Sequence, residues 1–186
     1  SPMKGNMLGV VNLNTLLQTE LNPAADDKAE FKFGEITFRE GDRVMQIRNN
    51  YDILWKRCDG LGAGTGIFNG DIGTIARIDF EAELVTIDFD DRRAEYSFDM
   101  LSELEPAYAM TVHKSQGSEY RAVILSAFSG SQLLLTRSVL YTAITRAREL
   151  FIIVGNEEVI AAMTRNDRQQ RRYSGLKLRL EQGEPS

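Results

Sequence analysis

The spacing of apolar residues divides the chain into a helical start, an all-β middle and a mixed last third. Between Val10 and Leu21 apolar residues recur near helical spacing, and the Asn22-Pro23 pair that follows is a helix stop. Asn12 and Asn14 are candidate caps. The pattern predicts one amphipathic helix, whose apolar face would consist of Val10, Leu13, Leu16, Leu17 and Leu21.

From Glu35 onward the apolar period changes to two, and turn residues separate the runs. The runs are rich in Val, Ile, Thr and aromatic residues, which favours strands. They read ITFREGDRVMQIRN, FNGDIGTIARID, ELVTIDFD and RAEYSF. We predict four or five short strands in a small antiparallel barrel or sandwich, with Asn69-Gly70 and Asp90-Asp91 as turns.

The last third of the chain has an alternating strand and helix texture. Ala122 to Phe128 (AVILSAF) and Leu150 to Val154 (LFIIV) are continuous apolar runs, typical of strands buried on both faces. Val139 to Arg148 between them has helical spacing, so we predict a parallel crossover. Glu157 to Met163 and the basic stretch from Arg165 to Leu180 predict one or two terminal helices.

Composition narrows the class of protein. The chain has 186 residues, 42% of them hydrophobic, and a net charge of −5, which is typical of soluble globular domains. No apolar run approaches the roughly 18 residues of a membrane span, and no secretory leader is recognisable. Cys58 is the single cysteine and there is one His, which excludes an internal disulfide and a zinc cluster of Cys and His. We expect a soluble cytoplasmic protein without a metal centre of its own.

Charge is unevenly distributed along the chain. Residues 35–105 hold 8 basic and 16 acidic side chains, whereas residues 106–186 hold 11 basic and 7 acidic ones. A polyanionic partner would therefore meet the last third first, although an ordinary solvated surface explains the charges equally well.

Gly60 to Gly66 (GLGAGTG) looks like a phosphate-binding loop at first sight. No Lys-Ser or Lys-Thr follows it and no helix opens after it, so we predict a mobile hairpin loop instead. The whole chain lacks a GxxxxGK[ST] motif. A complete P-loop ATPase is therefore not encoded in these residues.

A polar cluster stands at Tyr108 to Tyr120 (YAMTVHKSQGSEY), after a short apolar lead and before a buried strand. Hydroxyls, a Lys and an imidazole at a loop-to-helix junction suit phosphate oxygens, and Gly117 would allow close backbone approach. A solvated loop with a capping box, in which Ser115 and Ser118 lie near Glu119, is the alternative.

A second cluster, LYTAITRAR at Leu140 to Arg148, combines an apolar helix face with Arg146 and Arg148 near the expected helix end. A cation near a helix C-terminus is common because it compensates the helix dipole. On spacing alone, Arg146 is therefore more often a surface cation than a catalytic residue.

Together the two clusters resemble motifs V and VI of superfamily 1 DNA helicases, and are most similar to the RecD-like branch, the exodeoxyribonuclease V alpha subunit and its relatives. Further strings resemble the same branch in the same order. They are SPM at Ser1 to Met3, NLNTLLQ at Asn12 to Gln18, FNGDIG at Phe68 to Gly73 and RRYSGL at Arg171 to Leu176.

The resemblance implies an α/β fold. Residues 1–34 plus 106–186 would form the second RecA-like, P-loop-type motor domain, a parallel sheet with flanking helices, and residues 35–105 an inserted small all-β SH3-like barrel. The first motor domain, with the Walker A Lys and the carboxylates of Walker B, would be a separate region of the same protein. It would also supply the Mg²⁺ ligands for ATP.

The resemblance also implies roles for individual residues. It assigns contacts with single-stranded DNA to Thr111, His113, Lys114 and Ser115. It assigns contacts with ATP to Gln116, Gly117, Glu119 and Arg146. Glu119 would lie near the ribose, because a carboxylate is repelled by phosphates but accepts from sugar hydroxyls. Arg146 would be the arginine finger, since a planar, always-charged guanidinium suits the charge that develops on a transferred phosphoryl group.

The implied activity is ATP-driven 5′ to 3′ translocation on single-stranded DNA with duplex unwinding, in recombination or repair. The chain alone would be inactive, and nuclease or helicase subunits of an exodeoxyribonuclease V complex are further expected partners. A free-standing DNA-binding or regulatory module, or part of a conjugative relaxase-helicase, is the alternative. Ile53 to Ile67 is longer than the family link, and there Trp55 would either stack on DNA or pack on its own barrel.

Overall fold

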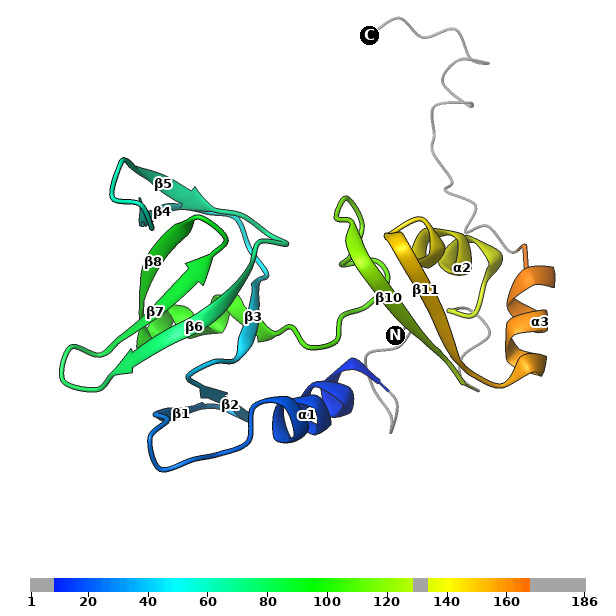
Figure 1. The fold of residues 1–186 in the computed structure, drawn as a ribbon, viewed down its shortest axis with the longest axis horizontal. Helices are drawn as coiled ribbons and strands as arrows, with labels where there is room; N and C mark the ends of the chain where they lie inside the picture. The colour runs from blue at the N-terminus through cyan, green and yellow to red at the C-terminus, as the bar shows by residue number, and fades with distance from the viewer. Residues whose placement is uncertain (1–8, 129–133, 168–186) are drawn as a thin grey trace, which may run out of the picture.

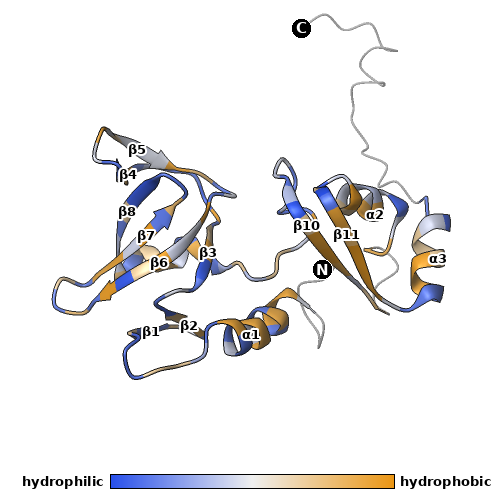
Figure 2. Cartoon of the chain, in the orientation of Figure 1, coloured by the Kyte–Doolittle hydropathy of each residue, from blue (hydrophilic) through white to orange (hydrophobic). Residues whose placement is uncertain are grey.

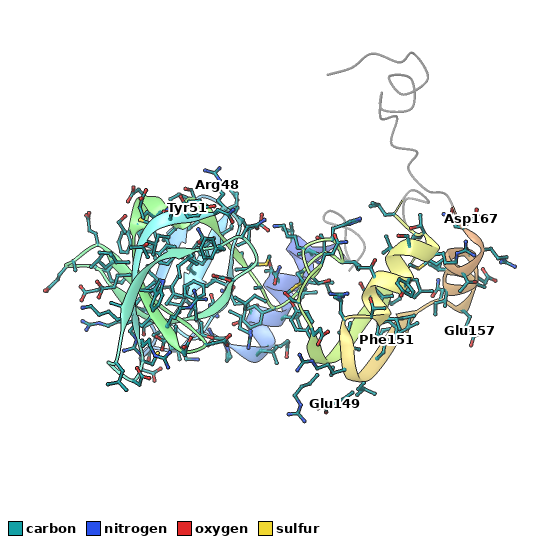
Figure 3. The ribbon with its side chains drawn as sticks, turned by 90° about the horizontal axis from the view of Figure 1, so that it is seen from above. Arg48, Tyr51, Glu149, Phe151, Glu157 and Asp167 are labelled. Carbon is teal, nitrogen blue, oxygen red and sulfur yellow. The ribbon has the colours of Figure 1, made fainter. Side chains whose placement is uncertain are left out.

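The computed structural model describes residues 9–128 and 134–167, which form an all-β region and a smaller α/β region with helix α1 between them (Figures 1 and 3). Strands β1 to β9 lie in the all-β region, where β1 and β2 form a two-stranded sheet of their own, and β10 to α3 lie in the α/β region. The elements in chain order are α1 (Val10–Leu21), β1 (Glu30–Phe33), β2 (Ile36–Arg39), β3 (Arg43–Gln46), β4 (Asn50–Arg57), β5 (Ala63–Ile67), β6 (Ile72–Asp79), β7 (Leu84–Phe89), β8 (Arg92–Ser97), the 3₁₀ helix η1 (Phe98–Glu103), β9 (Leu104–Pro106), β10 (Tyr120–Ala127), α2 (Arg137–Ile144), β11 (Ala147–Gly155) and α3 (Glu157–Arg165).

The main sheet of the all-β region has seven antiparallel strands in the order β5-β4-β8-β7-β6-β3-β9, and it curls around one apolar core (Figure 1). Strict alternation in β7 points Val85, Ile87 and Phe89 into this core. In β6 a bulge after Ile75 resets the alternation, so that both Ile75 and Ile78 face inward. The sequence prediction of a small antiparallel barrel is therefore confirmed.

The predicted turns are also present, but the predicted number of strands is too low. Asp90 and Asp91 form the two-residue turn between β7 and β8, with Asp90 at φ 47°, and Asn69-Gly70 turns between β5 and β6. The runs behind the prediction of four or five strands leave out β4, β5 and β9. Strand β5 escapes the pattern because its sequence AGTGI has the composition of a glycine loop. Only the start of that glycine-rich segment is a loop.

Glycine is needed in β5 because a large side chain lies across it. A Cβ on Gly64 would come within 2.5 Å of the Trp55 ring, which also lies 5.7 Å from the Arg92 guanidinium carbon. Trp55 is half-buried and packs against the barrel core. Of the two sequence alternatives for Trp55, the structure has the one in which it packs on its own barrel.

Helix α1 has the predicted bounds, but it docks through a different face. Its N-cap is Gly9, without a side-chain cap bond, and Asn12 and Asn14 lie inside the helix. Asn14 is buried, whereas Leu16 and Leu21 are 52% and 68% exposed. The expected apolar face is thus wrong for these two residues, because the buried side of the helix is centred on Val10 and on Asn14, whose side-chain amide makes hydrogen bonds to Ala109.

The α/β region has the predicted crossover. Strands β10 and β11 are parallel, with Ala122 opposite Leu150 and Ala127 opposite Gly155, and α2 connects them. Helices α2 and α3 pack on one face of this pair, where Leu125, Ala143 and Met163 are buried. The predicted helix at Glu157 to Met163 is confirmed as α3.

The prediction that both strands are buried on both faces is wrong within the described residues. Figure 2 shows β10 and β11 in the hydrophobic colour over much of their length. The apolar side chains that face away from α2 and α3 are exposed. They are Ile124 (66%), Leu150 (52%), Ile152 (39%) and Val154 (48%). The described residues provide helices for one side only, and their parallel sheet has two strands, so the larger RecA-like sheet stays a prediction.

None of the helices in the described ranges has the length and apolar character needed to cross a lipid bilayer. Three predictions concern residues outside these ranges: the SPM string, the RRYSGL string and most of the basic stretch from Arg165 to Leu180.

Candidate functional site

The polar segment before β10 is a series of tight turns. Residues 112–117 are turn residues, and the amide of Ser115 donates to the Thr111 carbonyl at 3.2 Å. Gly117 has φ +93°, a conformation that favours glycine. The expected loop-to-helix junction is therefore wrong, because a strand follows the turns and no helix N-terminus is offered to a phosphate there.

The candidate DNA-contacting residues differ in their exposure. His113 is exposed, Thr111 and Lys114 are half-buried, and Ser115 is 8% exposed. The Ser115 hydroxyl donates to the Val112 carbonyl at 2.7 Å, so it is engaged in the turn. The alternative from the sequence, a capping box at Ser115, is not formed, because no helix follows this turn.

Lys114 is held by an ion pair. Its Nζ lies 2.6 Å from Oε2 of Glu105, a residue of β9, and both side chains are partly buried. Its amide also donates to the Thr111 hydroxyl at 3.3 Å. The cation is therefore tied to the last strand of the barrel and not freely solvated.

Arg146 lies against the polar segment although it is 28 positions away from Ser118 in the sequence. Its Nη1 donates to the Ser118 carbonyl at 3.1 Å, and its carbonyl accepts from the Tyr120 amide at 2.8 Å. Its Nε is buried and finds no acceptor among the described residues. The fold thus brings the two sequence clusters together at Ser118 and Arg146.

Arg146 does not lie in a helix, which is where its spacing had placed it. Helix α2 ends at Ile144 with Thr145 as its C-cap, and β11 begins at Ala147. The helical prediction through Arg148 is wrong because backbone pairing with β10 takes over at that point. Arg146 therefore does not lie in the last turn of a helix, as the alternative of a dipole-compensating surface cation requires.

Glu119 and Arg148 form an ion pair at the same place. Nε of Arg148 lies 2.6 Å from Oε2 of Glu119, with the two side chains 66% and 52% exposed. Gln116 and Gly117 are exposed on the preceding turn. The structure therefore gathers the four residues expected to contact ATP around one corner of β10 and β11. Gln116, Gly117 and Glu119 are exposed there, whereas Arg146 is half-buried.

A second polar network, which the sequence pattern did not predict, lies at the start of the segment. Tyr108 donates its hydroxyl to Oδ1 of Asp42 at 2.9 Å. Burial, followed by this bond to a carboxylate, raises the pKa of Tyr108 to about 12. The signal in the sequence is the polar residues Asn14, Gln18 and Asn22 at steps of four, a helical period that the apolar pattern hides.

Metal ligands are not grouped in the described stretches of the chain. Within residues 9–128 and 134–167, no three His, Cys, Asp or Glu side chains are arranged to hold a metal ion.

Two family models match the chain. The ATP-dependent RecD-like DNA helicase SH3 domain matches residues 13–89, and the UvrD-like helicase C-terminal domain matches residues 106–154. The first covers most of α1 and the barrel strands through β7, and the second covers the polar segment, β10, α2 and nearly all of β11.

Curated relatives agree with both matches. The ATP-dependent RecD2 DNA helicase of Deinococcus radiodurans is 33% identical over 171 residues, which are 90% of this chain and 22% of that protein. The RecBCD enzyme subunit RecD of Mycolicibacterium smegmatis is 37% identical over 118 residues, 63% of this chain and 20% of that protein. The chain belongs to the RecD-like helicase family.

A third relative extends the match over nearly the whole chain. The RecBCD enzyme subunit RecD of Haemophilus influenzae is 26% identical over 179 residues, 96% of this chain. The chain spans about a fifth to a quarter of the length of these curated relatives. Within the RecD-like family the curled sheet is the SH3-like barrel, whereas the boundaries at residues 34 and 105 stay predictions; the β1–β2 hairpin crosses the first of them.

Proposed function

We propose that this chain is the C-terminal part of an ATP-dependent DNA helicase, which contacts both ATP and one DNA strand. In the whole protein, ATP hydrolysis would drive 5′ to 3′ translocation and duplex unwinding in recombination or repair. The observation that best supports this is the bond between the Arg146 guanidinium and the Ser118 carbonyl, because it unites the two motif segments at one corner of the sheet.

The ATP-contacting side of this corner consists of Gln116, Gly117, Glu119 and Arg146. The unpartnered buried Nε of Arg146 and the exposed, acceptor-only carboxylate of Glu119 suit a phosphate and a ribose hydroxyl respectively. ATP bound with Mg²⁺ supplies the phosphoryl group, and the Mg²⁺ ligands would come from a Walker-type domain outside this chain. Arg146 would stabilise negative charge that develops on that group.

The DNA-contacting side consists of the turn residues Thr111, His113, Lys114 and Ser115. Phosphate contacts position a strand without reading its sequence, and an exposed imidazole and an ammonium are suited to them. Ser115 would act by fixing the turn, because its hydroxyl is already bonded to Val112. Subunits of a RecBCD-type enzyme are proposed partners, since several relatives carry that name.

The decisive experiment uses a protein in which this chain is joined to its Walker A and Walker B domain. Arg146→Ala should leave folding and DNA binding near normal while DNA-stimulated ATP turnover falls by roughly 10³ or more, because an arginine finger acts mainly in the transition state. Arg146→Lys should restore little, since a point charge does not reproduce the guanidinium fork.

Arg148→Ala is the matched control, because Arg148 lies only two residues farther along, inside β11, and pairs with Glu119. Turnover of Arg146→Ala within about threefold of the wild type would remove the finger role, and an equal loss in Arg148→Ala would show that the effect is not specific to Arg146. The 186-residue chain by itself should bind ATP weakly and show no DNA-stimulated hydrolysis.

A further inference from the structure

The segment that carries the candidate DNA-contacting residues is anchored at its start by α1. Asn14, which is 6% exposed, makes hydrogen bonds to both the carbonyl and the amide of Ala109. Its Nδ2 donates to the Ala109 carbonyl at 2.9 Å, and its Oδ1 accepts from the Ala109 amide at 2.8 Å. The neighbouring Tyr108 donates its hydroxyl to Asp42. Two consecutive residues are thus fixed before the turns begin.

Asp42 is the centre of this anchor. It is 2% exposed, and its carboxylate accepts four hydrogen bonds between 2.5 and 2.9 Å. The four donors are Gln18 Nε2, Asn22 Nδ2, the Arg39 amide and the Tyr108 hydroxyl. Each carboxylate oxygen accepts two of them, and only an acceptor-only group satisfies such a set. An Asn at this position would turn its own amide hydrogens toward two donors.

The network joins three segments of the chain that are remote in sequence. Gln18 and Asn22 belong to α1 and its C-cap, Asp42 lies between β2 and β3 of the barrel, and Tyr108 begins the connection to β10. Farther along, Lys114 returns to the barrel through its ion pair with Glu105. Residues 105–114 therefore form a short loop that is tied to the barrel at both ends.

We propose that Asp42 and Tyr108 are positioning residues for the Thr111 to Lys114 turn. They would hold the turn in place relative to the barrel, so that the Lys114 cation presents itself to a DNA phosphate at a fixed site. This inference rests on the proposed function of that turn in binding single-stranded DNA. Neither residue needs to touch the DNA itself.

Amide hydrogen exchange on the 186-residue chain tests the anchor without any ligand. Tyr108→Phe removes one hydroxyl and keeps the ring, so the barrel should fold normally. Exchange of the amides in residues 107–117 should quicken by about tenfold, the factor that corresponds to one lost hydrogen bond to a charged group. Tyr141→Phe is the control, because the Tyr141 ring is 68% exposed on α2. Unchanged exchange in residues 107–117 would overturn the anchor.

Fluorescence anisotropy with a labelled oligo-dT strand tests whether the anchor acts through Lys114. Tyr108→Phe should weaken binding by about threefold or more, and Lys114→Ala should weaken it at least as much. The double variant should lose no more affinity than Lys114→Ala alone, because Tyr108 would act only by positioning Lys114 and that side chain is already removed. Additive losses would mean that Tyr108 acts independently of Lys114 and would overturn the proposal.

The same measurements separate this inference from the proposed function. If Lys114→Ala binds the strand as well as the wild type does, the DNA role of the turn fails and the positioning role fails with it, whatever hydrogen exchange shows. If Lys114→Ala loses affinity while Tyr108→Phe does not, the proposed function stands and the positioning role fails. Asp42→Asn should repeat the Tyr108→Phe result in both assays. Asp52→Asn, the same change at an exposed position, is its control and should leave both readouts unchanged.

Discussion

The barrel and the β10–β11 pair both have apolar strands to bury, and they bury them to different extents. In the barrel the sheet curls around its own core, and Val44, Ile67, Val85 and Ile87 are completely buried. The β10–β11 pair also carries a strongly apolar sequence. One of its faces packs on α2 and α3, whereas Ile124, Leu150 and Val154 on the opposite face are exposed within the described residues.

The difference shows that a sheet buries its apolar face by itself only when it curls into a closed barrel. A sheet that curls on itself needs no other element to cover its inner face, whereas a short parallel pair needs a layer on each side. An apolar run in the sequence therefore describes what a strand could bury, and the surrounding elements decide how much of it is buried. Each of the following predictions tests this contrast, or the junction between the barrel and the α/β region.

The largest effect should come from truncating matched isoleucines in the two regions. Ile87 is 0% and Ile124 is 66% exposed, and both lie inside a strand. Ile87→Ala should cost about 3 to 4 kcal/mol of unfolding free energy, because it leaves a cavity in a closed core, and Ile124→Ala less than about 1 kcal/mol. Urea unfolding followed by circular dichroism measures both. Equal losses would mean that the second face of β10 is covered after all.

The second effect concerns the junction. Asp42→Asn should cost about 2 to 3 kcal/mol of unfolding free energy, since two buried donors would face an amide instead of a carboxylate oxygen. Asp52→Asn, an exposed change of the same chemistry, should stay within about 0.5 kcal/mol. The same urea experiment decides, and a small loss for Asp42→Asn would show that the network is not needed to join α1 to the barrel.

A third, smaller effect is expected at high pH. The pKa of Tyr108 is about 12 in the folded chain, whereas an unfolded tyrosine titrates near 10. Between these values the unfolded chain has lost the proton that the folded chain keeps. Stability is therefore fully present below about pH 10 and falls as the pH rises toward about 12.

Tyr108→Phe should make this high-pH decline shallower. It should not abolish the decline, because burial also raises the pKa of Tyr96 in the barrel core. Unfolding free energies at several pH values between about 9 and about 12 provide the measurement. A decline as steep in Tyr108→Phe as in the wild type would assign the whole effect to other groups, Tyr96 among them.

The smallest effect should come from the surface of the β10–β11 pair. Arg121 and Glu149 pair at 3.0 Å with side chains 84% and 59% exposed. A double-mutant cycle with alanine at both positions should give a coupling of at most about 0.5 kcal/mol, and less at high salt. A coupling above about 1 kcal/mol would mean that this surface is less solvated than its exposure suggests.

Local patterns in the sequence are enough for most of the elements and for the family. The period of two between Glu35 and Ser97 predicts the barrel, the Asp90-Asp91 turn is readable from two residues, and the strand-helix-strand order after Pro106 predicts the crossover. These features depend on neighbours within a few residues. The motif strings are likewise local, which is why they point to the RecD-like family without any knowledge of the fold.

Contacts between distant residues decided the rest. Polar side chains of α1 are engaged because Asp42 and Ala109 offer hydrogen-bond partners, 24 positions from Gln18 and 95 positions from Asn14. Helix α2 ends at Ile144 because β10 pairs with the residues that follow. Arg146 meets Ser118 only through that pairing. The sequence by itself thus determined most of the strands and helices and all of the motif strings. The tertiary structure determined where α2 ends, which faces are buried and which motifs meet, because these depend on partners that no local pattern specifies.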